Sequence, residues 1–355
     1  GGRADAEGEV RAPAPPALPA PPRRSPAGVR PNAASPRSGV QPLPRPAIVA
    51  ALRPGSLAGG SMRDRIDPLI AERAKWLFRG TAGTEVARRV LDRALGYERT
   101  LEIAGRYRDL PTPEIMADIA DLICRDVEVR GLERVPKSGA AMIVANHPTG
   151  IADGIVMWHA LRRRRPDAFF YANSDILRVL PQMDSMIAPV EWRLDKRTHG
   201  KTRETMAYTR AAIEDGRIGV IFPAGRLAKR RGLRLHEREW MASAAMIARK
   251  FDLDVIPVNI RARNSWIFYL FDLLHPSLRD ITLFHETLNK DRQPYRVTVG
   301  RPVPAAKLSP NSAEAIEELK SRTLQLGGRH APDVSLPEVT RRPAWAKKME
   351  GLAGY

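Results

Sequence analysis

Residues 146–153 place a histidine and a carboxylate at a spacing that could support acid–base chemistry. A carboxylate bonded to one ring nitrogen of His147 would fix the tautomer and leave the other nitrogen able to take a proton. Asp153 lies close enough in the sequence to be that carboxylate. The alternative is a tight strand-to-helix turn in which Asp153 only interacts favourably with the first helical turn. This stretch alone leaves both interpretations open.

The elements around His147 would bring it to a typical ligand position. Residues 140–145 are apolar and predict a buried strand. Pro148 and Gly150 predict a turn, and a helix from about Ile151 to Leu161 follows. His147 would then lie at the carboxyl end of a strand, where open α/β sheets usually bind their ligands.

A second strand, predicted over Ile218–Phe222, ends in Pro223-Ala-Gly-Arg226. Gly225 would let a ligand approach the backbone closely. Arg226 could bind a phosphate through two parallel hydrogen bonds. The alternative is a strand-ending turn with solvated basic residues behind it.

A third strand is predicted over Asp254–Ile260. It contains Pro257, which predicts an edge strand or an interruption because proline lacks a backbone donor. Arg261 and Arg263 follow it.

In this order, the three stretches resemble the glycerophospholipid acyltransferase family, of the lysophosphatidate acyltransferase type. That family carries Asn-His followed by a nearby Asp, then Phe-Pro-x-Gly, then a Val-Ile-Pro-Val strand. The corresponding residues here are Asn146-His147 with Asp153, Phe222–Gly225 and Val255–Val258. The resemblance covers about half of the chain, from Val127 to Val303.

The resemblance is greatest to a bacterial subgroup often labelled hemolysins. The first motif of that subgroup reads Asn-His-Pro-x-Gly-x-x-Asp, which residues 146–153 match. Arg263-Asn-Ser265 also resembles the subgroup. Residues 171–178 with 187–190 resemble the second, substrate-binding block of the family.

Two departures from the family pattern affect the expected substrate. Five residues separate His147 from Asp153, one more than the common family spacing, and the subgroup shares this spacing. In the third motif, Ala224 stands where the family usually has Glu, and Arg226-Leu227 replace Thr-Arg. The usual phosphate-binding pattern is therefore altered, which leaves the acceptor lipid open.

The resemblance implies an O-acyltransferase that moves a fatty acyl group from acyl-CoA or acyl-carrier protein to a lysolipid hydroxyl, lysophosphatidate or a relative of it. His147 would be the general base and Asp153 would orient it. No metal or tightly bound cofactor is implied. The implied substrate-binding residues are Asn146, Thr149, Gly150, Phe222, Pro223, Gly225, Arg226 and Pro257.

Two other functions stay open. The altered third motif is compatible with an acyltransferase for lyso-ornithine lipid or another aminolipid. The formal charge of +18 is compatible with a nucleic-acid-binding protein. Aromatic residues are only 6% and do not interleave regularly with basic ones, so we expect no nucleic acid as partner. Residues 162–165, four arginines, could be a solvated turn.

The length of 355 residues predicts one or two domains. Hydrophobic residues make up 43% of the chain. Cys124, its one cysteine, lies in an apolar helical pattern typical of a core position. We expect an α/β fold, a mixed sheet flanked by helices as in the acyltransferases, with an N-terminal helical appendage. The expected parts are a disordered Pro/Ala/Arg-rich segment (1–61), a helical region (62–126), the acyltransferase domain (127–326) and a loose tail (327–355).

No apolar run is long enough for a spanning helix, so we expect a cytoplasmic protein held peripherally at the inner face of the cell membrane. Residues 62–106 interleave arginines with Trp76-Leu-Phe78, and could lie on an anionic membrane or pack as ordinary helices. Trp266–Leu274 is short and apolar, and predicts either a buried or an interfacial helix.

Overall fold

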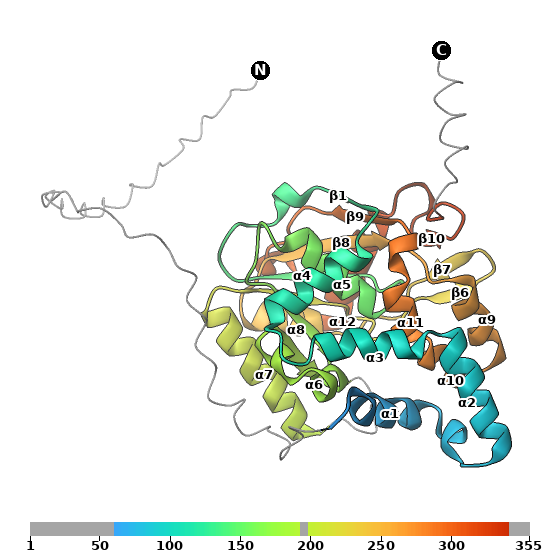
Figure 1. Cartoon of the computed structure of the whole chain (residues 1–355). Coiled ribbons are helices and arrows are strands. Elements are labelled where there is room, and N and C mark those ends of the chain that lie inside the picture. The colour runs from blue at the N-terminus through green and yellow to red at the C-terminus, as the bar shows by residue number, and fades with distance from the viewer. Residues whose placement is uncertain (1–59, 192–197, 341–355) are drawn as a thin grey trace, which may run out of the picture. The chain divides into compact units, whose positions relative to one another are not determined.

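The computed structural model describes residues 60–191 and 198–340 (Figure 1). Residues 1–59 of the segment predicted to be disordered lie outside the described residues. Residues 341–355 of the predicted tail lie outside them as well. The strands are β1 (Val127–Arg130), β2 (Ala141–Ala145), β3 (Phe169–Asn173), β4 (Ile187–Val190), β5 (Ile218–Ile221), β6 (Lys229–Arg231), β7 (Arg234–His236), β8 (Val255–Arg261), β9 (Tyr295–Val299) and β10 (Val334–Ser335).

The main sheet has seven strands in the order β1-β9-β8-β2-β5-β3-β4. Neighbours are parallel except β8 and β9, which are antiparallel. The sheet is therefore mixed, and the predicted α/β class is confirmed. A second, three-stranded antiparallel sheet has the order β10-β7-β6.

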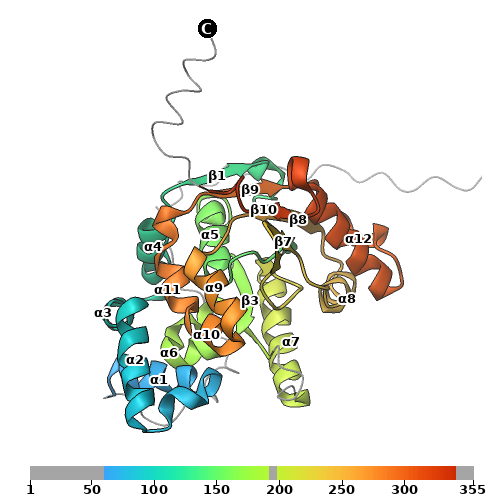
Figure 2. The ribbon, with the colours of Figure 1, turned by 90° about the vertical axis from the view of Figure 1, so that its right-hand side faces the viewer.

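Helices cover both faces of the main sheet (Figures 1 and 2). The central strand β2 is buried throughout, and its side chains alternate between two cores, with Ile143 on one face and Val144 on the other. The helices are α1 (Met62–Arg73), α2 (Ala82–Ala94), α3 (Tyr97–Arg106), α4 (Thr112–Ile123), α5 (Ile151–Leu161), α6 (Asp175–Val179), α7 (His199–Glu214), α8 (Ser243–Lys250), α9 (Trp266–Leu274), α10 (Pro276–Ile281), α11 (Leu283–Leu288) and α12 (Ser312–Gln325).

The first core, on the face of Ile143, is built largely by α4 and α5, and the second by α7, α8 and α12. Because β2 lies between these two layers, its carboxyl end is packed from both sides. The residues that follow β2 are those with the candidate histidine.

Pro257 does not mark an edge or an interruption, so that prediction is wrong. The strand β8 that contains it runs unbroken over Val255–Arg261 between β2 and β9. The carbonyl of Pro257 accepts a hydrogen bond from the amide of Gly300, just beyond the end of β9. The strand tolerates proline because the one missing donor lies at the end of the regular β8–β9 pairing, which stops at Val258 and Val299.

The N-terminal helical region packs against the rest of the fold. Met62, Ile66 and Leu69 of α1 are buried in the first core. Arg73 at the end of α1 forms an ion pair with Asp175 on α6, at 2.7 Å. The alternative of ordinary packed helices therefore holds for α1.

The predicted tail from Gly327 is not loose over its described part. Val334 and Ser335 form β10, which pairs with β7. Val339 is buried with Phe268 of α9. Residues 327–340 are thus part of the fold, because the backbone of β10 completes the small sheet and Val339 fills its core.

The arginine run 162–165 is not simply a solvated turn. Arg165 is 1% exposed and holds Asp167 through two nitrogens, at 2.8 and 2.7 Å. It also donates to the carbonyls of Pro136 and Gly216. This arginine joins three loops, so its charge is not available to a nucleic acid.

Candidate active site

His147 and Asp153 form the pair that their spacing predicts. The imidazole Nδ1 lies 2.9 Å from Oδ2 of Asp153, whose side chain is fully buried at the start of α5. The backbone amides of Thr149 and Gly150 also donate to Oδ2, at 2.9 and 3.0 Å. An ionised carboxylate can only accept hydrogen bonds, so Nδ1 must carry the proton that it donates to Asp153. Nε2 is then the ring nitrogen that can accept a hydrogen bond.

The turn between β2 and α5 is shaped to hold this pair. Gly150 has φ +97°, in the region that favours glycine, and an added Cβ there would lie 3.2 Å from Leu227. The hydroxyl of Thr149 donates to Oδ1 of Asp153 and lies 2.7 Å from the hydroxyl of Tyr295, a buried residue of β9. Both carboxylate oxygens of Asp153 are thereby occupied, which fixes the orientation of His147.

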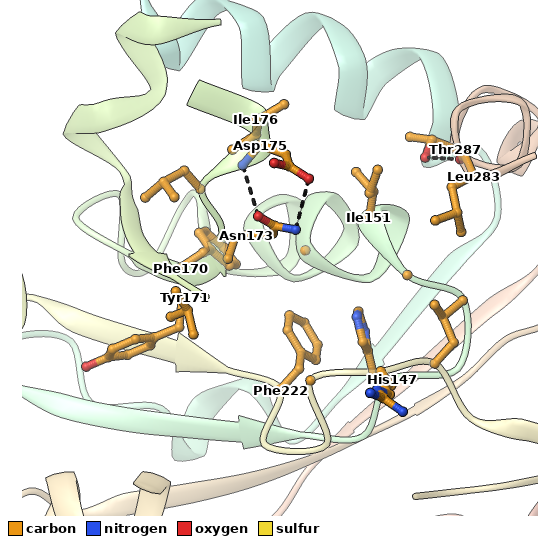
Figure 3. Close-up of a pocket in the computed structure, with 18 of the residues that line it drawn as sticks. His147, Ile151, Phe170, Tyr171, Asn173, Asp175, Ile176, Phe222, Leu283 and Thr287 are labelled. Atoms are coloured by element: carbon orange, nitrogen blue, oxygen red, sulfur yellow. Dashed lines mark hydrogen bonds between the residues drawn. The ribbon is translucent and has the colours of Figure 1, made fainter. Parts of the chain in front are cut away.

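The ring of Phe222 packs against the ring of His147 (Figure 3). The two centroids are 4.5 Å apart and the planes differ by 24°, a stacked arrangement. Phe222 follows β5, the strand next to β2 in the sheet. The ends of two neighbouring strands, β2 and β5, thus meet at the imidazole.

A large apolar cavity opens beside His147. Its volume is about 900 Å³, within the range of small-molecule sites. Ile151 of α5 and Phe170 of β3 line it, and Figure 3 shows both around the space next to His147 and Phe222. Further walls come from the N-terminal helices, through Ile66 of α1, Ile103 of α3 and Ile115 of α4.

The predicted substrate-binding residues divide into two groups. The structure brings Gly150, Phe222, Pro223, Gly225 and Arg226 to the wall of the cavity. Asn146, Thr149 and Pro257 are buried and support the site from behind. The amide of Asn146 exchanges two hydrogen bonds with the backbone of Ile260, at 2.9 and 2.7 Å, and so ties the end of β2 to β8.

Basic side chains gather at one part of the cavity. Arg226, Arg238 and Arg279 all line it. Burial lowers the pKa of Arg238, and the positive charges of Arg279 and Arg226 lower it further. Asp272 and Glu237 oppose this effect, and Arg279 is already paired with Asp272 and Asp280, at 3.0 and 2.7 Å. The sequence prediction included Arg226 but missed Arg238, which lies twelve positions further along without a motif around it.

A buried ion pair supports the turn from the other side and was also missed. Lys290 and Glu286 are both 0% exposed, and their charged atoms lie 3.0 Å apart. Lys290 also donates to Oδ1 of Asn264, at 2.7 Å, and the amide nitrogen of Asn264 donates to the carbonyl of Thr149. Glu286 accepts from the backbone of Ser265, at 2.8 Å. The Arg263-Asn-Ser265 motif is therefore the link between this pair and the turn.

The protonation of that pair follows from its surroundings. Burial lowers the pKa of Lys290, and the adjacent Glu286 opposes part of this effect. Burial alone would raise the pKa of Glu286, but Lys290 and Ser265 outweigh it and hold the pKa below its ordinary value. Each residue thus depends on the other to stay charged inside the protein.

Cys124 is a packing residue, as predicted. It lies at the end of α4 against the first core. Burial raises the pKa of its thiol to about 12, so the reactive thiolate is not formed near neutral pH.

Glu237 contacts the backbone of the candidate base. Its Oε2 accepts from the amide of His147, at 3.2 Å, and its Oε1 accepts from the indole of Trp240, at 3.0 Å. Burial raises the pKa of Glu237 to about 7, although the two hydrogen bonds act in the opposite direction. No sequence motif indicated this residue.

We expect Glu237 to make stability depend on pH. Because its folded pKa lies above the ordinary 4.5, its ionisation destabilises the fold, and the free energy of unfolding should fall as pH rises from about 4.5 to about 7. Glu237→Gln should match the wild type at pH 5 and be more stable at pH 8, by roughly 1–3 kcal/mol. Urea unfolding at both pH values measures this.

The neighbouring Glu239, which is exposed, provides the matched control. Glu239→Gln should leave the pH dependence as it is in the wild type. Equal curves for Glu237→Gln and the wild type between pH 5 and pH 8 would contradict the assignment.

Comparisons with known proteins find similar sequences. The sequence profile of the acyltransferase family matches residues 126–261. The lyso-glycine lipid O-acyltransferases of Phocaeicola vulgatus and Bacteroides thetaiotaomicron are each 26% identical to the chain over 184 residues. These matches cover 50% of the chain, and 64% and 66% of the two relatives, which is less than two thirds of their length.

A solved structure is also similar. The 1-acyl-sn-glycerophosphate acyltransferase PlsC of Thermotoga maritima aligns with 68% of this chain and 95% of its own, at 12% identity and a TM-score of 0.40. The family profile spans the strand β2, the turn with His147 and Asp153, and the strand β8. Through this region, the chain is similar to the acyltransferase family, as its motifs predict.

Proposed function

We propose that this protein transfers a fatty acyl group from a thioester to the hydroxyl of a lysolipid. The observation that carries the proposal is the His147–Asp153 pair at the wall of an apolar cavity of about 900 Å³. The names of the relatives support the same reaction class, O-acyl transfer to a lysolipid.

In the proposed reaction, Nε2 of His147 takes the proton of the acceptor hydroxyl. The acceptor oxygen attacks the thioester carbonyl, forms the ester bond and releases the thiolate when the carbon–sulfur bond breaks. The thiolate then takes the proton from the imidazolium, so that no charge or atom is left over. Asp153, held by three further donors, keeps Nε2 in position and stabilises the imidazolium.

The lining of the cavity suits two kinds of substrate group. Its apolar walls, from Ile66, Ile103 and Ile115 on the N-terminal helices to Phe170 on β3, suit an acyl chain. Arg226 and Arg238 suit an anionic headgroup, whereas Arg279 is paired with Asp272 and Asp280. The donor in the proposal is acyl-CoA or acyl-carrier protein, with no metal or further cofactor.

Two acceptor classes fit the basic side chains. A lysophosphatidate would present a phosphate, and a glycine-type lysolipid would present a carboxylate. The names of the two relatives favour the aminolipid class, and so does the replacement of the usual glutamate by Ala224. We therefore propose an aminolipid acceptor first and lysophosphatidate second.

The acceptor is tested by measuring acyl transfer to a panel of lysolipids with both thioester donors. Arg226→Ala should raise the acceptor KM roughly 10–100-fold, the expected effect of a lost charge-assisted hydrogen bond, and leave the donor KM nearly unchanged. Arg226→Lys should restore little, because the planar fork is lost.

Arg210→Ala provides the control, since Arg210 is exposed on α7 and does not line the cavity. An acceptor KM that stays at the wild-type value in Arg226→Ala would exclude Arg226 from acceptor binding.

We also propose that the protein acts at a membrane surface, where a lysolipid resides. None of the helices within residues 60–191 and 198–340 is both long and apolar enough to cross a bilayer. The proposed association is therefore peripheral for the described part of the chain, with an anionic membrane as partner.

A further inference from the structure

The helix α9 exposes one apolar side. Trp266, Leu270, Leu273 and Leu274 are 72%, 41%, 70% and 64% exposed. Their spacing of four, seven and eight positions places them on the same side of a helix. We call these four residues the α9 stripe. They account for four of the nine large hydrophobic side chains that are exposed in the described part of the chain.

The other sides of α9 are buried in the protein. Phe268 and Tyr269 are buried and, with Asp272, line the cavity next to His147. Ile267 and Phe271 pack with the buried Leu77 of the N-terminal region. The sequence left open whether this helix is buried or interfacial, and the structure shows that it is buried on these sides and exposed along the α9 stripe.

A hairpin lies beside α9 (Figure 1). Strands β6 and β7 form this hairpin, and Leu235 of β7 packs with Phe268 and Tyr269. The guanidinium of Arg230 lies over the ring of Tyr269, 5.7 Å from its centroid. At the tip, Leu233 is 67% exposed.

The charges around this tip are mostly positive. Lys229 and Arg231 are exposed, and the side chain of Arg234 is 56% exposed. Arg234 has an acidic neighbour, Asp333, at 3.7 Å. An apolar tip between cations is the composition that inserts into an anionic lipid surface.

We propose that the α9 stripe and the tip of the β6–β7 hairpin together dock this protein on an anionic bilayer. The proposal rests on the proposed function, because a bilayer is chosen over a protein partner on the ground that the substrate is a lipid. The same two elements line the cavity, through Phe268 and Tyr269 of α9 and Lys229 and Arg230 of the hairpin. A lysolipid that leaves a docked bilayer would therefore meet the cavity directly.

This surface differs from the one that the sequence suggested. The sequence left open whether residues 62–106 lie on a membrane or pack as ordinary helices, and α1 is packed into the fold. On α2, Val86 and Val90 are exposed and provide the competing surface for a test.

Vesicle sedimentation with the full chain tests the proposal. The vesicles consist of phosphatidylcholine, alone or mixed with phosphatidylglycerol, and the assay contains no acyl donor. The wild type should bind the mixed vesicles more tightly. Leu273→Asp with Leu274→Asp should weaken binding at least about tenfold, because two apolar side chains no longer enter the lipid. Arg231→Gln with Arg234→Gln should weaken binding to the mixed vesicles about fivefold per arginine.

Controls separate docking from folding. Met246→Asp changes a residue that is 55% exposed on α8 and should bind like the wild type. All variants should keep the wild-type melting temperature, since the changed side chains are exposed. None of the four changed leucine and arginine residues lines the cavity, so acyl transfer to a monomerically dispersed acceptor should keep its rate.

Three results would overturn the proposal. The first is wild-type binding by the Leu273→Asp, Leu274→Asp variant. The second is a loss of binding in Val86→Asp with Val90→Asp but not in the α9 variant. The third is a wild-type dimer in sedimentation velocity that the α9 changes convert to a monomer, which would assign the α9 stripe to a second copy. The assay measures vesicle binding without turnover, so it still tests docking if the protein proves not to transfer acyl groups.

Discussion

His147→Ala should reduce acyl transfer by roughly 10²–10⁴-fold, the usual effect of losing a general base. The reason is the geometry of the imidazole. Nδ1 is held by Asp153 at 2.9 Å, the ring is stacked on Phe222, and the cavity lies beside it. The measurement is kcat/KM with an accepted lysolipid, for purified wild type and variant.

The variant should remain folded, because the His147 side chain is at the cavity wall and 18% exposed. Asp153→Asn provides a graded comparison, since it keeps the shape of the carboxylate but orients the imidazole less well. It should retain more activity than His147→Ala. A near wild-type rate in His147→Ala would exclude the proposed general base.

Lys290→Met should destabilise the protein by about 3–5 kcal/mol. Lys290 and Glu286 are both fully buried, so the substitution leaves the charge of Glu286 without its partner. The variant also loses the hydrogen bond from Lys290 to Asn264, which holds the turn at Thr149. The measurement is the free energy of unfolding in urea.

Lys320→Met is the matched control. Lys320 also faces a glutamate within one helix, Glu317 at 3.6 Å, but that glutamate is 61% exposed. Its loss should change stability by less than about 1 kcal/mol. The double variant Glu286→Gln, Lys290→Met should recover part of the stability, because no buried charge remains. If Lys290→Met cost no more than Lys320→Met, the buried pair would not support the site as described.

The sequence predicts the centre of the site well because its geometry is local. His147 and Asp153 are six positions apart and lie on the two sides of a single turn. The strand before that turn is apolar throughout and the helix after it is mainly apolar, so both elements could be predicted. The predicted helix from Ile151 to Leu161 matches α5.

The residues that support His147 and its turn could not be predicted, because they are far from the turn in the sequence. Tyr295 reaches Thr149 across 146 positions, and Glu237 reaches His147 across 90. A buried lysine such as Lys290 has no local signal, since the same residue type is usually exposed. Only the fold shows which charged residues are inside.

The small strands were missed for a similar reason. Strands β6 and β7 have three residues each and consist mainly of basic residues, a composition typical of a solvated turn. They form a hairpin because Leu235 packs on α9 and β10 completes their sheet. The N-terminal helices could likewise be predicted as helices, but not as walls of the cavity next to His147.

The most direct test of the account follows the fate of the acyl group. Purified full-length protein is incubated with an isotope-labelled acyl-CoA or acyl-carrier protein and a lysolipid, and the products are identified by mass spectrometry. We expect a labelled ester on the lysolipid hydroxyl that forms with wild type and is nearly absent with His147→Ala. Release of the label only as free fatty acid, or ester formation at the same rate in His147→Ala, would contradict it.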